Sequence, residues 1–406
     1  MNLPERLLTR ATPVLQQARL KPAPGLPDQV HLSVTDRCFL PCAHCDIWRN
    51  KTIDLPEATW LNVLDQMGAW LGKASVNFVG GEPLLRKDLE RLMTRATTLG
   101  FDVSFNTNGW LLDDRRAAGL ADAGARIAYL SMDGFRAETI DRSRGRVGTQ
   151  AKLVEVCDRL DKRPNPRVVI ACILHAENAG EIPDLLHWVK ERGYELVVQP
   201  LYQNFGENAH DPAWWRSSPL WPTTPEQLSR IDHALDVLID ERSRWGKVCN
   251  EVAQLRAFKH HFRNPAVPNG QTCKAGHSDI AFDPAGNVRL CYFLEPVGNL
   301  SEGVPIAAMW NRLGALRRRY EVSRCTRSCN LLNCNFDAPG CALGLGHSVT
   351  IFWHFFRPLA PPRVPSRAPV RVDSGASLVC HARLRSRPAR RNVLARHRGY
   401  APLRSR

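Results

Sequence analysis

The stretch DRCFLPCAHCDIWRNK, residues 36–51, decides how the rest of the sequence is interpreted. It follows the strand-like run VHLSV (30–34) and places Cys38, Cys42 and Cys45 within eight positions. Three thiols cannot pair off among themselves, so disulfides alone do not explain them. Their grouping predicts a metal or iron–sulfur site, and the open question is what completes it.

Two kinds of site fit three neighbouring thiols. Structural zinc takes four protein ligands, usually from paired C-x2-C elements. His44 offers a fourth ligand, although its place between Cys42 and Cys45 is cramped. An iron–sulfur cluster held by three thiolates instead leaves one iron open to a group from outside the protein. The spacing favours the cluster.

Between residues 30 and 200, on both sides of the cysteines, short strand-like runs alternate with helical ones. The predicted strands cover 30–34, 75–80, 101–107, 127–131, 167–174 and 195–200. Between the first two, residues 56–71 place Leu61, Leu64, Met67 and Leu71 on one helical face, and residues 86–96 form the next helix. This alternation predicts an α/β fold with a parallel sheet and a site at the carboxyl ends of its strands.

Three short motifs stand at those strand ends: GGEP (80–83), NTNG (106–109) and SMDG (131–134). Together with Cys-x3-Cys-x2-Cys after the first strand, they resemble the radical S-adenosylmethionine (SAM) enzymes. The resemblance implies a partial (β/α)6 TIM-like barrel. It also implies that Cys38, Cys42 and Cys45 hold a [4Fe-4S] cluster whose open iron binds SAM.

The same resemblance implies which residues contact SAM and what reaction follows. The candidates are His44, Gly80, Gly81, Glu82, Pro83, Thr107, Asn108, Gly109, Ser131, Asp133, Asn178 and Gln199. Ordinary turns, helix caps and loop hydrogen bonds are the alternative explanations for them. An external donor such as flavodoxin or ferredoxin would reduce the cluster. Cleavage of SAM to a 5′-deoxyadenosyl radical would then remove a hydrogen atom from a peptide or protein side chain or a small molecule.

A second cysteine group occupies residues 273–343, which resemble the SPASM and twitch extensions of radical SAM enzymes. The resemblance implies a small C-terminal α+β domain with one auxiliary [4Fe-4S] cluster. After Cys273, the turn DPAGN (283–287) between SDIAF and VRLC predicts a β-hairpin. The best ligands are Cys273, Cys291, Cys325 and Cys329, with Cys334 and Cys341 as substitutes or members of another site. The spacings depart from a full SPASM pattern, and zinc remains an alternative for this group.

The remaining features of the barrel region have two interpretations each. Cys157, Cys172 and Cys249 are expected to be small buried hydrophobic residues, but Cys172 could instead point inward and donate a hydrogen atom. The Trp-rich loop 202–225 within the barrel domain (30–225) is either a substrate cap or a segment packed on the next domain. Connecting helices are expected over 226–272, opened by a capping box of Thr224 and Gln227. The first of them is expected to bury a stripe of Leu228, Ile231, Leu235 and Leu238.

Charge and composition bound the partners. Residues 357–406 contain thirteen Arg and one Asp, which accounts for +12 of the net charge of +15. We therefore expect 1–29 to be a helical extension and 344–406 to be a disordered tail, with nucleic-acid binding as a third-ranked function. A non-catalytic iron–sulfur or zinc protein ranks second. The clustered thiols and the absence of an apolar signal or membrane span predict a cytoplasmic protein.

Overall fold

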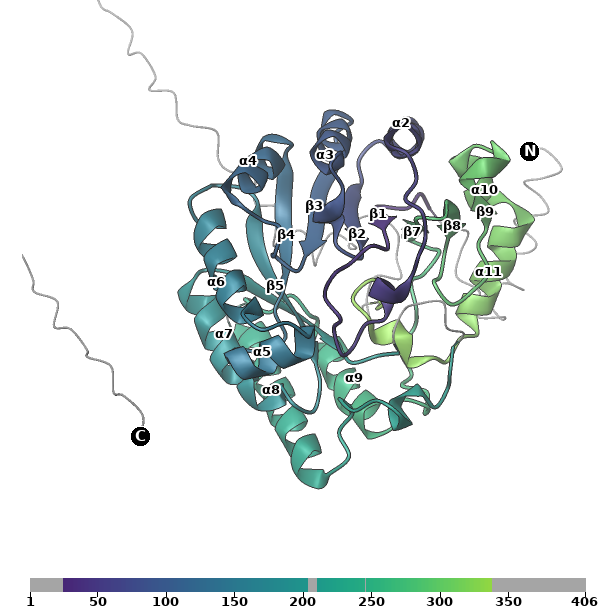
Figure 1. The fold of residues 1–406 in the computed structure, drawn as a ribbon. Coiled ribbons are helices and arrows are strands. Elements are labelled where there is room, and N and C mark those ends of the chain that lie inside the picture. Colours follow the sequence, from purple (N-terminus) through teal and green to yellow (C-terminus); the bar gives the residue numbers. More distant parts are fainter. Residues whose placement is uncertain (1–24, 204–209, 245, 338–406) are drawn as a thin grey trace, which may run out of the picture. The chain divides into compact units, whose positions relative to one another are not determined.

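The structure is a computed structural model that describes residues 25–203, 210–244 and 246–337 (Figure 1). Most of the expected N-terminal extension, Cys341 and the whole of the Arg-rich tail lie outside these described residues. The predictions made for those segments therefore remain predictions.

All six strands predicted for the barrel are confirmed. They are β1 (Gln29–Thr35), β2 (Ser75–Gly80), β3 (Asp102–Thr107), β4 (Ala125–Ser131), β5 (Arg167–Leu174) and β6 (Glu195–Pro200). Each pairs in parallel with the next along the chain. The sheet stays open, and its carboxyl edge collects the loops that carry the sequence motifs.

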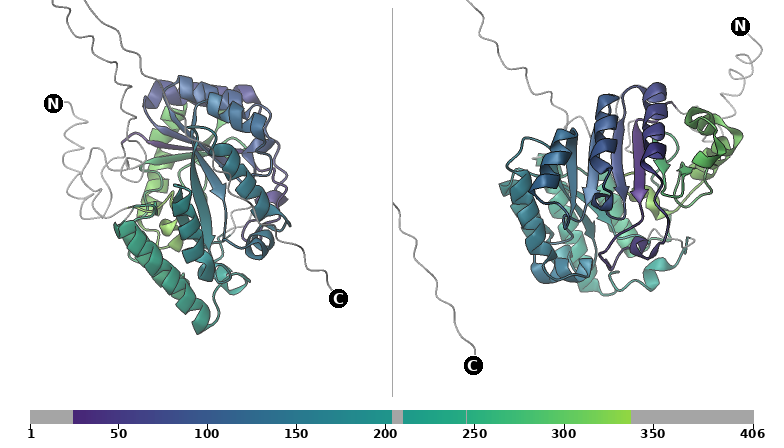
Figure 2. Two further views of the ribbon diagram at one scale, coloured as in Figure 1. Left: turned by 90° about the vertical axis from the view of Figure 1, so that its left-hand side faces the viewer. Right: turned by 45° about the horizontal axis from the view of Figure 1, so that its top comes forward.

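Helices separate the strands and cover one face of the sheet (Figures 1 and 2). Those between β1 and β6 are α2 (Glu57–Leu71), α3 (Leu89–Thr98), α4 (Asp114–Asp122), α5 (Ala137–Arg144), α6 (Thr149–Leu160) and α7 (Ile182–Glu191). In α2 the buried residues are Trp60, Val63, Leu64 and Met67. Leu64 and Met67 of the predicted face are buried, whereas Leu61 and Leu71 are partly buried and pack against the core.

The strands alternate between a face packed on the helices and an inner face. Val168, Ile170, Cys172 and Leu174 of β5 belong to the main core, together with the buried residues of α7. Val169, between them, lies on the other face with Ile127 and Cys249. Because side chains alternate along a strand, Cys172 faces the helices rather than the barrel interior. The inward-pointing interpretation of Cys172 is wrong, and its role as a small buried residue holds.

The sheet continues beyond the barrel into the second cysteine region. β7 (Asp279–Phe282) pairs in parallel with β1 and turns back into antiparallel β8 (Asn287–Arg289), which pairs with β9 (Gly298–Asn299). The hairpin was predicted, but its attachment to β1 was not. The described strands thus form one sheet in the order β6-β5-β4-β3-β2-β1-β7-β8-β9. Helices α10 (Ile306–Asn311) and α11 (Leu313–Ser323) complete this α+β region.

The described tryptophans of the loop after β6 are packed into the protein. Trp214 and Trp221 are buried, and their rings meet at 5.3 Å between centroids. Trp221 also lies 5.3 Å from His261, which belongs to α9 (Val252–Arg263). Packing against the following helices therefore explains these two side chains better than a substrate cap does.

The connecting segment begins as the sequence indicates. At the start of α8 (Pro225–Arg244), the backbone N–H of Gln227 donates to Thr224 Oγ1 at 3.3 Å. The backbone N–H of Thr224 donates in return to Gln227 Oε1 at 3.1 Å. This reciprocal pair is the predicted capping box. Ile231, Leu235 and Leu238 of the predicted stripe are buried.

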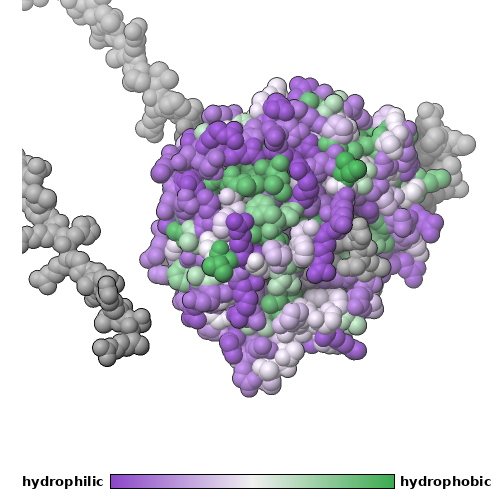
Figure 3. All heavy atoms as spheres, viewed as in Figure 1, coloured by the Kyte–Doolittle hydropathy of each residue, from purple (hydrophilic) through white to green (hydrophobic). Residues whose placement is uncertain are grey.

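The surface is mostly hydrophilic on the face shown in Figure 3, with apolar areas among the polar side chains. None of the described helices combines the length and the apolar content needed to cross a bilayer.

Candidate functional site

The sequence motifs meet at the carboxyl edge of the sheet. The loop after β1 carries Cys38, Cys42 and Cys45, and GGEP, NTNG and SMDG stand where β2, β3 and β4 end. Neighbouring parallel strands bring their ends to the same edge, so these segments become neighbours in space. The structure therefore brings the predicted site residues together at one edge of the sheet, and the contacts below show what each residue touches there.

Gly80 and Gly81 allow two loops to approach each other. A Cβ at Gly81 would lie 2.3 Å from the Arg37 carbonyl oxygen, and one at Gly80 would lie 2.2 Å from that of Thr35. Between the same segments, the Gly81 N–H donates to Thr35 O at 2.7 Å and the Glu82 N–H to Arg37 O at 2.8 Å. The two glycines thus fasten the cysteine loop to the end of β2.

Glu82 is fully buried, and its carboxylate is engaged by protein donors. Oε1 accepts from Thr107 Oγ1 at 2.9 Å and from the Leu84 N–H at 3.1 Å, while Oε2 accepts from the Asn108 N–H at 2.8 Å. Burial raises the pKa of Glu82 to about 7 despite these donors. Pro83, beside it, opens a short 3-10 turn. The geometry makes Glu82 a link between the ends of β2 and β3.

Asn108 turns its side chain toward the cysteines. Its Oδ1 accepts from the Trp110 N–H at 3.0 Å, and its Nδ2 lies 4.0 Å from Cys38 Sγ. Gly109 takes φ 81°, a left-handed conformation that glycine adopts without strain, and donates its N–H to Thr107 Oγ1. The NTNG turn therefore places an amide nitrogen against one thiol.

Asp133 is also fully buried and is surrounded by protein donors. Its Oδ2 lies 2.8 Å from Arg144 Nε and accepts from Ser143 Oγ at 3.0 Å. Its Oδ1 accepts from the Ile173 N–H at 3.0 Å. Burial alone would raise the pKa of Asp133, but the Arg144 charge, His44, the Ile173 N–H and His175 together outweigh burial and lower the pKa below its usual range.

Arg144 is a site residue that the sequence does not reveal. It ends α5, where an arginine is ordinarily solvated, yet it is buried, with Nη1 4.0 Å from Cys42 Sγ. Its guanidinium therefore bridges the Asp133 carboxylate and the cysteine loop. Only the tertiary fold brings these groups together, so no local pattern could have indicated the contact.

His44 and Ser131 occupy the same edge of the sheet. His44 is buried, with Nδ1 3.8 Å from Asp133 Oδ2, and burial lowers its pKa to about 4. It is therefore neutral at pH 7. Ser131 ends β4 and remains partly exposed. Their predicted contacts with SAM stay predictions.

Asn178 and Gln199 make contacts within the protein. The Asn178 side-chain amide donates to the carbonyl oxygens of Asp133 and Ile173 and accepts from the His175 N–H, so it joins the ends of β4 and β5. Gln199 Oε1 accepts from the Asn333 N–H at 3.3 Å, which links β6 to the second cysteine region. These contacts favour the structural explanation of both residues over a contact with SAM.

Four cysteines of the second group are mutual neighbours. Cys273 interacts electrostatically with Cys291, Cys325 and Cys329, and Cys329 interacts with Cys291 and Cys325. Cys334 lies apart from most of them, because its charged neighbours are Asp279 and Lys274 together with Cys291. The four that converge are those expected as the best ligands.

The thiols fit iron–sulfur clusters better than a single ion. Among the described residues, no three His, Cys, Asp or Glu side chains come close enough together to hold one metal ion. A four-iron cluster is larger, so its thiolates are more widely spaced. Cys38, Cys42 and Cys45 are electrostatic neighbours, and none of the eleven described cysteines forms a disulfide. Burial raises the pKa of Cys45 to about 11, so iron would displace its proton.

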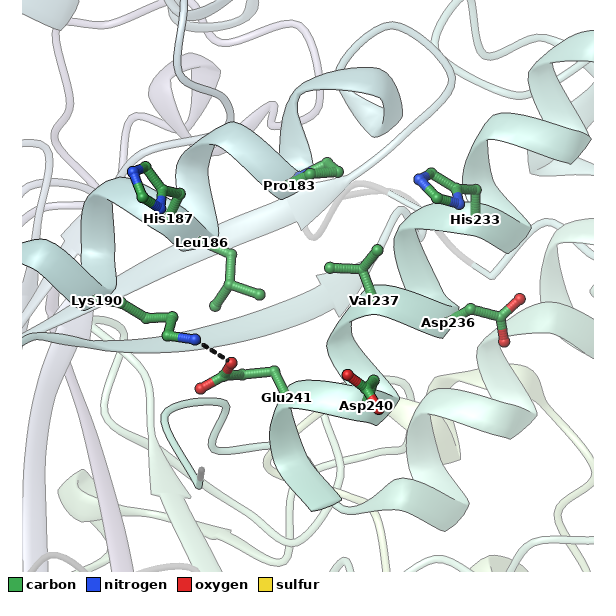
Figure 4. A pocket seen from close by; sticks show the side chains of 9 residues that line it. All are labelled: Pro183, Leu186, His187, Lys190, His233, Asp236, Val237, Asp240 and Glu241. Carbon is green, nitrogen blue, oxygen red and sulfur yellow. Dashed lines mark hydrogen bonds and ion pairs between the residues drawn. The ribbon is translucent and has the colours of Figure 1, made fainter. Parts of the chain in front are cut away.

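An open groove of about 380 Å³ lies elsewhere, between α7 and α8 (Figure 4). It is lined by Pro183, Leu186, His187, Lys190, His233, Asp236, Val237, Asp240 and Glu241. The Lys190 ammonium faces the Glu241 carboxylate across it at 2.7 Å. Its lining comes from two helices and includes none of the strand-end residues, so the groove is separate from the cysteine site.

Comparisons with known proteins agree with this geometry. The model of the family described as "Radical SAM superfamily" matches residues 32–189. The PqqA peptide cyclase of Rhodopseudomonas palustris is 34% identical over 305 residues, which cover 72% of this chain and 76% of that protein. The chain belongs to the radical SAM superfamily.

Other radical SAM proteins match over different lengths. The probable GTP 3′,8-cyclase of Methanothermobacter thermautotrophicus is 30% identical over 45% of this chain and 60% of its own. In fold, SuiB of Streptococcus suis gives a TM-score of 0.57 at 14% identity, covering 79% of this chain and 74% of SuiB. The structure described as native anSMEcpe with bound AdoMet gives a TM-score of 0.56 at 17% identity, covering 82% of this chain and 96% of that chain. These two structures confirm the fold class.

The protein is therefore a radical SAM enzyme that uses a [4Fe-4S] cluster and SAM. When bound, this pair supplies reductive cleavage of SAM and hydrogen-atom abstraction. The chain's own residues form the setting for that chemistry: glycines hold the cysteine loop against β2, and buried carboxylates orient nitrogen donors toward Cys38 and Cys42. The interpretations as a non-catalytic metal protein or a nucleic-acid-binding protein are not favoured.

Proposed function

We propose that this radical SAM enzyme acts on a peptide, from which it removes a hydrogen atom. The observation that supports this most is the 34% identity with PqqA peptide cyclase, which extends over 305 residues and 72% of this chain. The GTP cyclase relative matches 45% of the chain. The longer match favours the peptide-directed relatives as guides to the substrate.

The cluster ligands follow from the positions of the thiols. Cys38, Cys42 and Cys45 hold the cluster that binds SAM, and Cys273, Cys291, Cys325 and Cys329 hold one auxiliary cluster. Mutual electrostatic contact within each group supports the two assignments. The first group has three thiols and the second has four, so the first leaves an iron open and the second does not.

The SAM contacts belong to residues that lie beside the first group at the carboxyl edge of the sheet. We assign these contacts to His44, Asn108, Ser131 and the backbone of residues 80–82. Glu82, Asp133 and Asn178 support the strand ends instead, because their polar atoms are engaged within the protein.

The cellular setting follows from the same thiols. We place the enzyme in the cytoplasm, where a flavodoxin or ferredoxin supplies the electron, because thiols that must ligate iron need a reducing compartment. The division into a barrel (30–225), connecting helices (226–272) and an auxiliary cluster domain (273–343) belongs to the same proposal. The pairing of β1 with β7 means that one sheet runs through both end domains.

Deuterium transfer tests the substrate class. Peptides encoded next to the gene would be produced in deuterated medium and incubated anaerobically with the reconstituted enzyme, SAM and dithionite. We expect 5′-deoxyadenosine whose mass has increased by deuterium from the peptide. Deuterium-labelled GTP serves as the comparison substrate. Transfer from GTP but not from any peptide would contradict the proposal, and so would product that stays unlabelled with every peptide.

A further inference from the structure

Two buried carboxylates at the ends of the strands on either side of β3 share an unexpected arrangement. Glu82 follows β2 and Asp133 follows β4, and both are fully buried. Each is engaged by protein donors, and each fixes a residue whose nitrogen points at a cysteine of the first group. Asn108 reaches Cys38, and Arg144 reaches Cys42, at 4.0 Å in both cases.

The first series of contacts leads from Glu82 through Asn108 to Cys38. Glu82 Oε2 accepts from the Asn108 backbone N–H, and Oε1 accepts from Thr107 Oγ1. These two hydrogen bonds fix the NTNG turn against the loop that follows β2. The Trp110 N–H donates to Asn108 Oδ1, which leaves only one orientation for the amide. That orientation directs the Nδ2 group at Cys38 Sγ.

The second series of contacts leads from Asp133 through Arg144 to Cys42. Ser143 Oγ and the Ile173 N–H hold the Asp133 carboxylate in place, and its Oδ2 lies 2.8 Å from Arg144 Nε. The guanidinium is therefore a fixed, buried positive charge. Its Nη1 is directed at Cys42 Sγ.

Cys45 differs from the other two cysteines in its hydrogen-bond partners. Among the hydrogen bonds of the described residues, no side-chain donor reaches the Cys45 sulfur, whose partner is the backbone N–H of Ile47. Two of the three thiolates thus receive nitrogen donors from side chains, and both donors rest on a buried carboxylate.

We propose that Asn108 and Arg144 raise the reduction potential of the cluster held by Cys38, Cys42 and Cys45, and that Glu82 and Asp133 act as positioning residues for them. The proposal rests on the cluster assignment above. Reduction adds one electron and so one negative charge to the cluster. Donors and positive charge at the sulfurs stabilise that added charge, so they favour the reduced state.

Redox titration of the anaerobic holoenzyme, followed by EPR spectroscopy without SAM, tests this effect. Leaving SAM out separates the effect on the cluster from any contact with the cofactor. Asn108→Ser removes the amide donor but keeps an oxygen that can accept from the Trp110 N–H. The double variant Asp133→Asn with Arg144→Gln removes both charges together, so no buried charge is left unpaired.

We expect the midpoint potential of the first cluster to fall in both variants. The double variant should change the reduction equilibrium at least tenfold, which is about 59 mV for a one-electron couple. Asn108→Ser should cause a smaller fall in the same direction. The auxiliary cluster is the internal reference, and its potential should not change.

Arg116→Gln is the matched control. Arg116 is buried and paired with Glu90, and it donates to the Leu84 and Arg86 carbonyl oxygens, but it contacts no cysteine. Its loss should leave the potential of the first cluster near the wild-type value. If Asp133→Asn with Arg144→Gln does not retain iron, Arg144→Lys keeps the charge, loses the Nη1 contact and should give an intermediate fall.

The outcomes separate this inference from the proposed function. Full iron content, an EPR signal that changes on adding SAM, and unchanged potentials in the variants would overturn the inference and leave the proposed function standing. An equal fall of the first cluster's midpoint potential in the variants and in the Arg116→Gln control would also overturn the inference. A wild-type protein without a SAM-sensitive signal would overturn both.

Discussion

The two cysteine groups are built in opposite ways. Cys38, Cys42 and Cys45 come from one loop of eight residues, whereas Cys273, Cys291, Cys325 and Cys329 come from three segments of the C-terminal region. Around the first group lie buried Glu82, Asp133 and Arg144. Near the second, the Arg327 charge acts on Cys291 and Cys329, and the Tyr202 side chain interacts with Cys329.

This difference follows from what each group must hold. A three-thiol cluster must accept a charged cofactor and change its own charge, so polar groups at fixed positions are useful beside it. A four-thiol cluster is closed by protein ligands and has no open iron for a cofactor. The comparison therefore predicts that changes near the first group alter chemistry, while changes near the second mainly alter assembly and stability.

Removing one ligand from each group gives the largest expected difference. Cys42→Ser should abolish formation of 5′-deoxyadenosine and lower the iron content from about eight to about four per chain. Cys329→Ser should lower iron by a similar amount but retain cleavage of SAM. Iron analysis and product chromatography measure both quantities.

The control for this pair is Cys157→Ser, a buried thiol outside both groups, which should keep the wild-type iron content. Cleavage of SAM that survives in Cys42→Ser but is lost in Cys329→Ser would reverse the two assignments.

Gly81→Ala tests how the cysteine loop is held. The added methyl group would meet the Arg37 carbonyl oxygen, so the loop must move away from β2. We expect the first cluster to be lost while the auxiliary iron, about four per chain, remains. Gly180→Ala is matched to it, because its nearest neighbour would be Arg230 at 3.8 Å, an ordinary contact. Full iron content in Gly81→Ala would show that the close approach is dispensable.

Trp221→Ala tests the loop between the two regions. The ring is buried against His261 and Phe262, so its removal leaves a cavity that should lower the free energy of unfolding by about 3–5 kcal/mol. Denaturant unfolding of the holoenzyme measures this. Trp215 is only partly buried, so replacing it by alanine should lower the free energy of unfolding by less. Unchanged stability together with weakened substrate binding would restore the interpretation of this loop as a substrate cap.

His261 gives a smaller, pH-dependent effect in the same cluster. Burial lowers the pKa of His261 to about 4, while its Nε2 lies 2.9 Å from the Leu201 carbonyl oxygen. In the unfolded chain His261 binds a proton near pH 6.5, whereas in the folded protein it does so only near pH 4. The free energy of unfolding therefore keeps its full value above pH 6.5 and decreases as the pH falls toward 4. The loss is about 3 kcal/mol over that range. His261→Gln should show a flatter dependence, and an identical slope in both proteins would contradict the prediction.

The sequence predicted local features of this fold well. The six barrel strands, the hairpin after Cys273 and the capping box at Thr224 all depend on nearby residues. The location of the site followed too, because strand-end motifs must meet when strands are parallel. Which four thiols of the second group converge also agrees with the expectation.

The remaining features depend on contacts between distant segments. Glu82 and Asp133 looked like cofactor ligands in the sequence, but each turns into the protein because donors from other loops surround it. Arg144 has no local pattern, and β7 joins β1 across about 250 residues of chain. Cys172 was ambiguous because a strand pattern gives alternation but not which face is the inner one.

The most direct test of the account compares the two clusters in one sample. SAM labelled with ¹⁷O in its carboxylate would be added to the reduced holoenzyme, and hyperfine coupling to each cluster signal would be recorded. We expect coupling only on the signal that Cys42→Ser removes, because only a three-thiol cluster has an open iron. Coupling on the signal that Cys329→Ser removes, or on neither signal, would contradict the account.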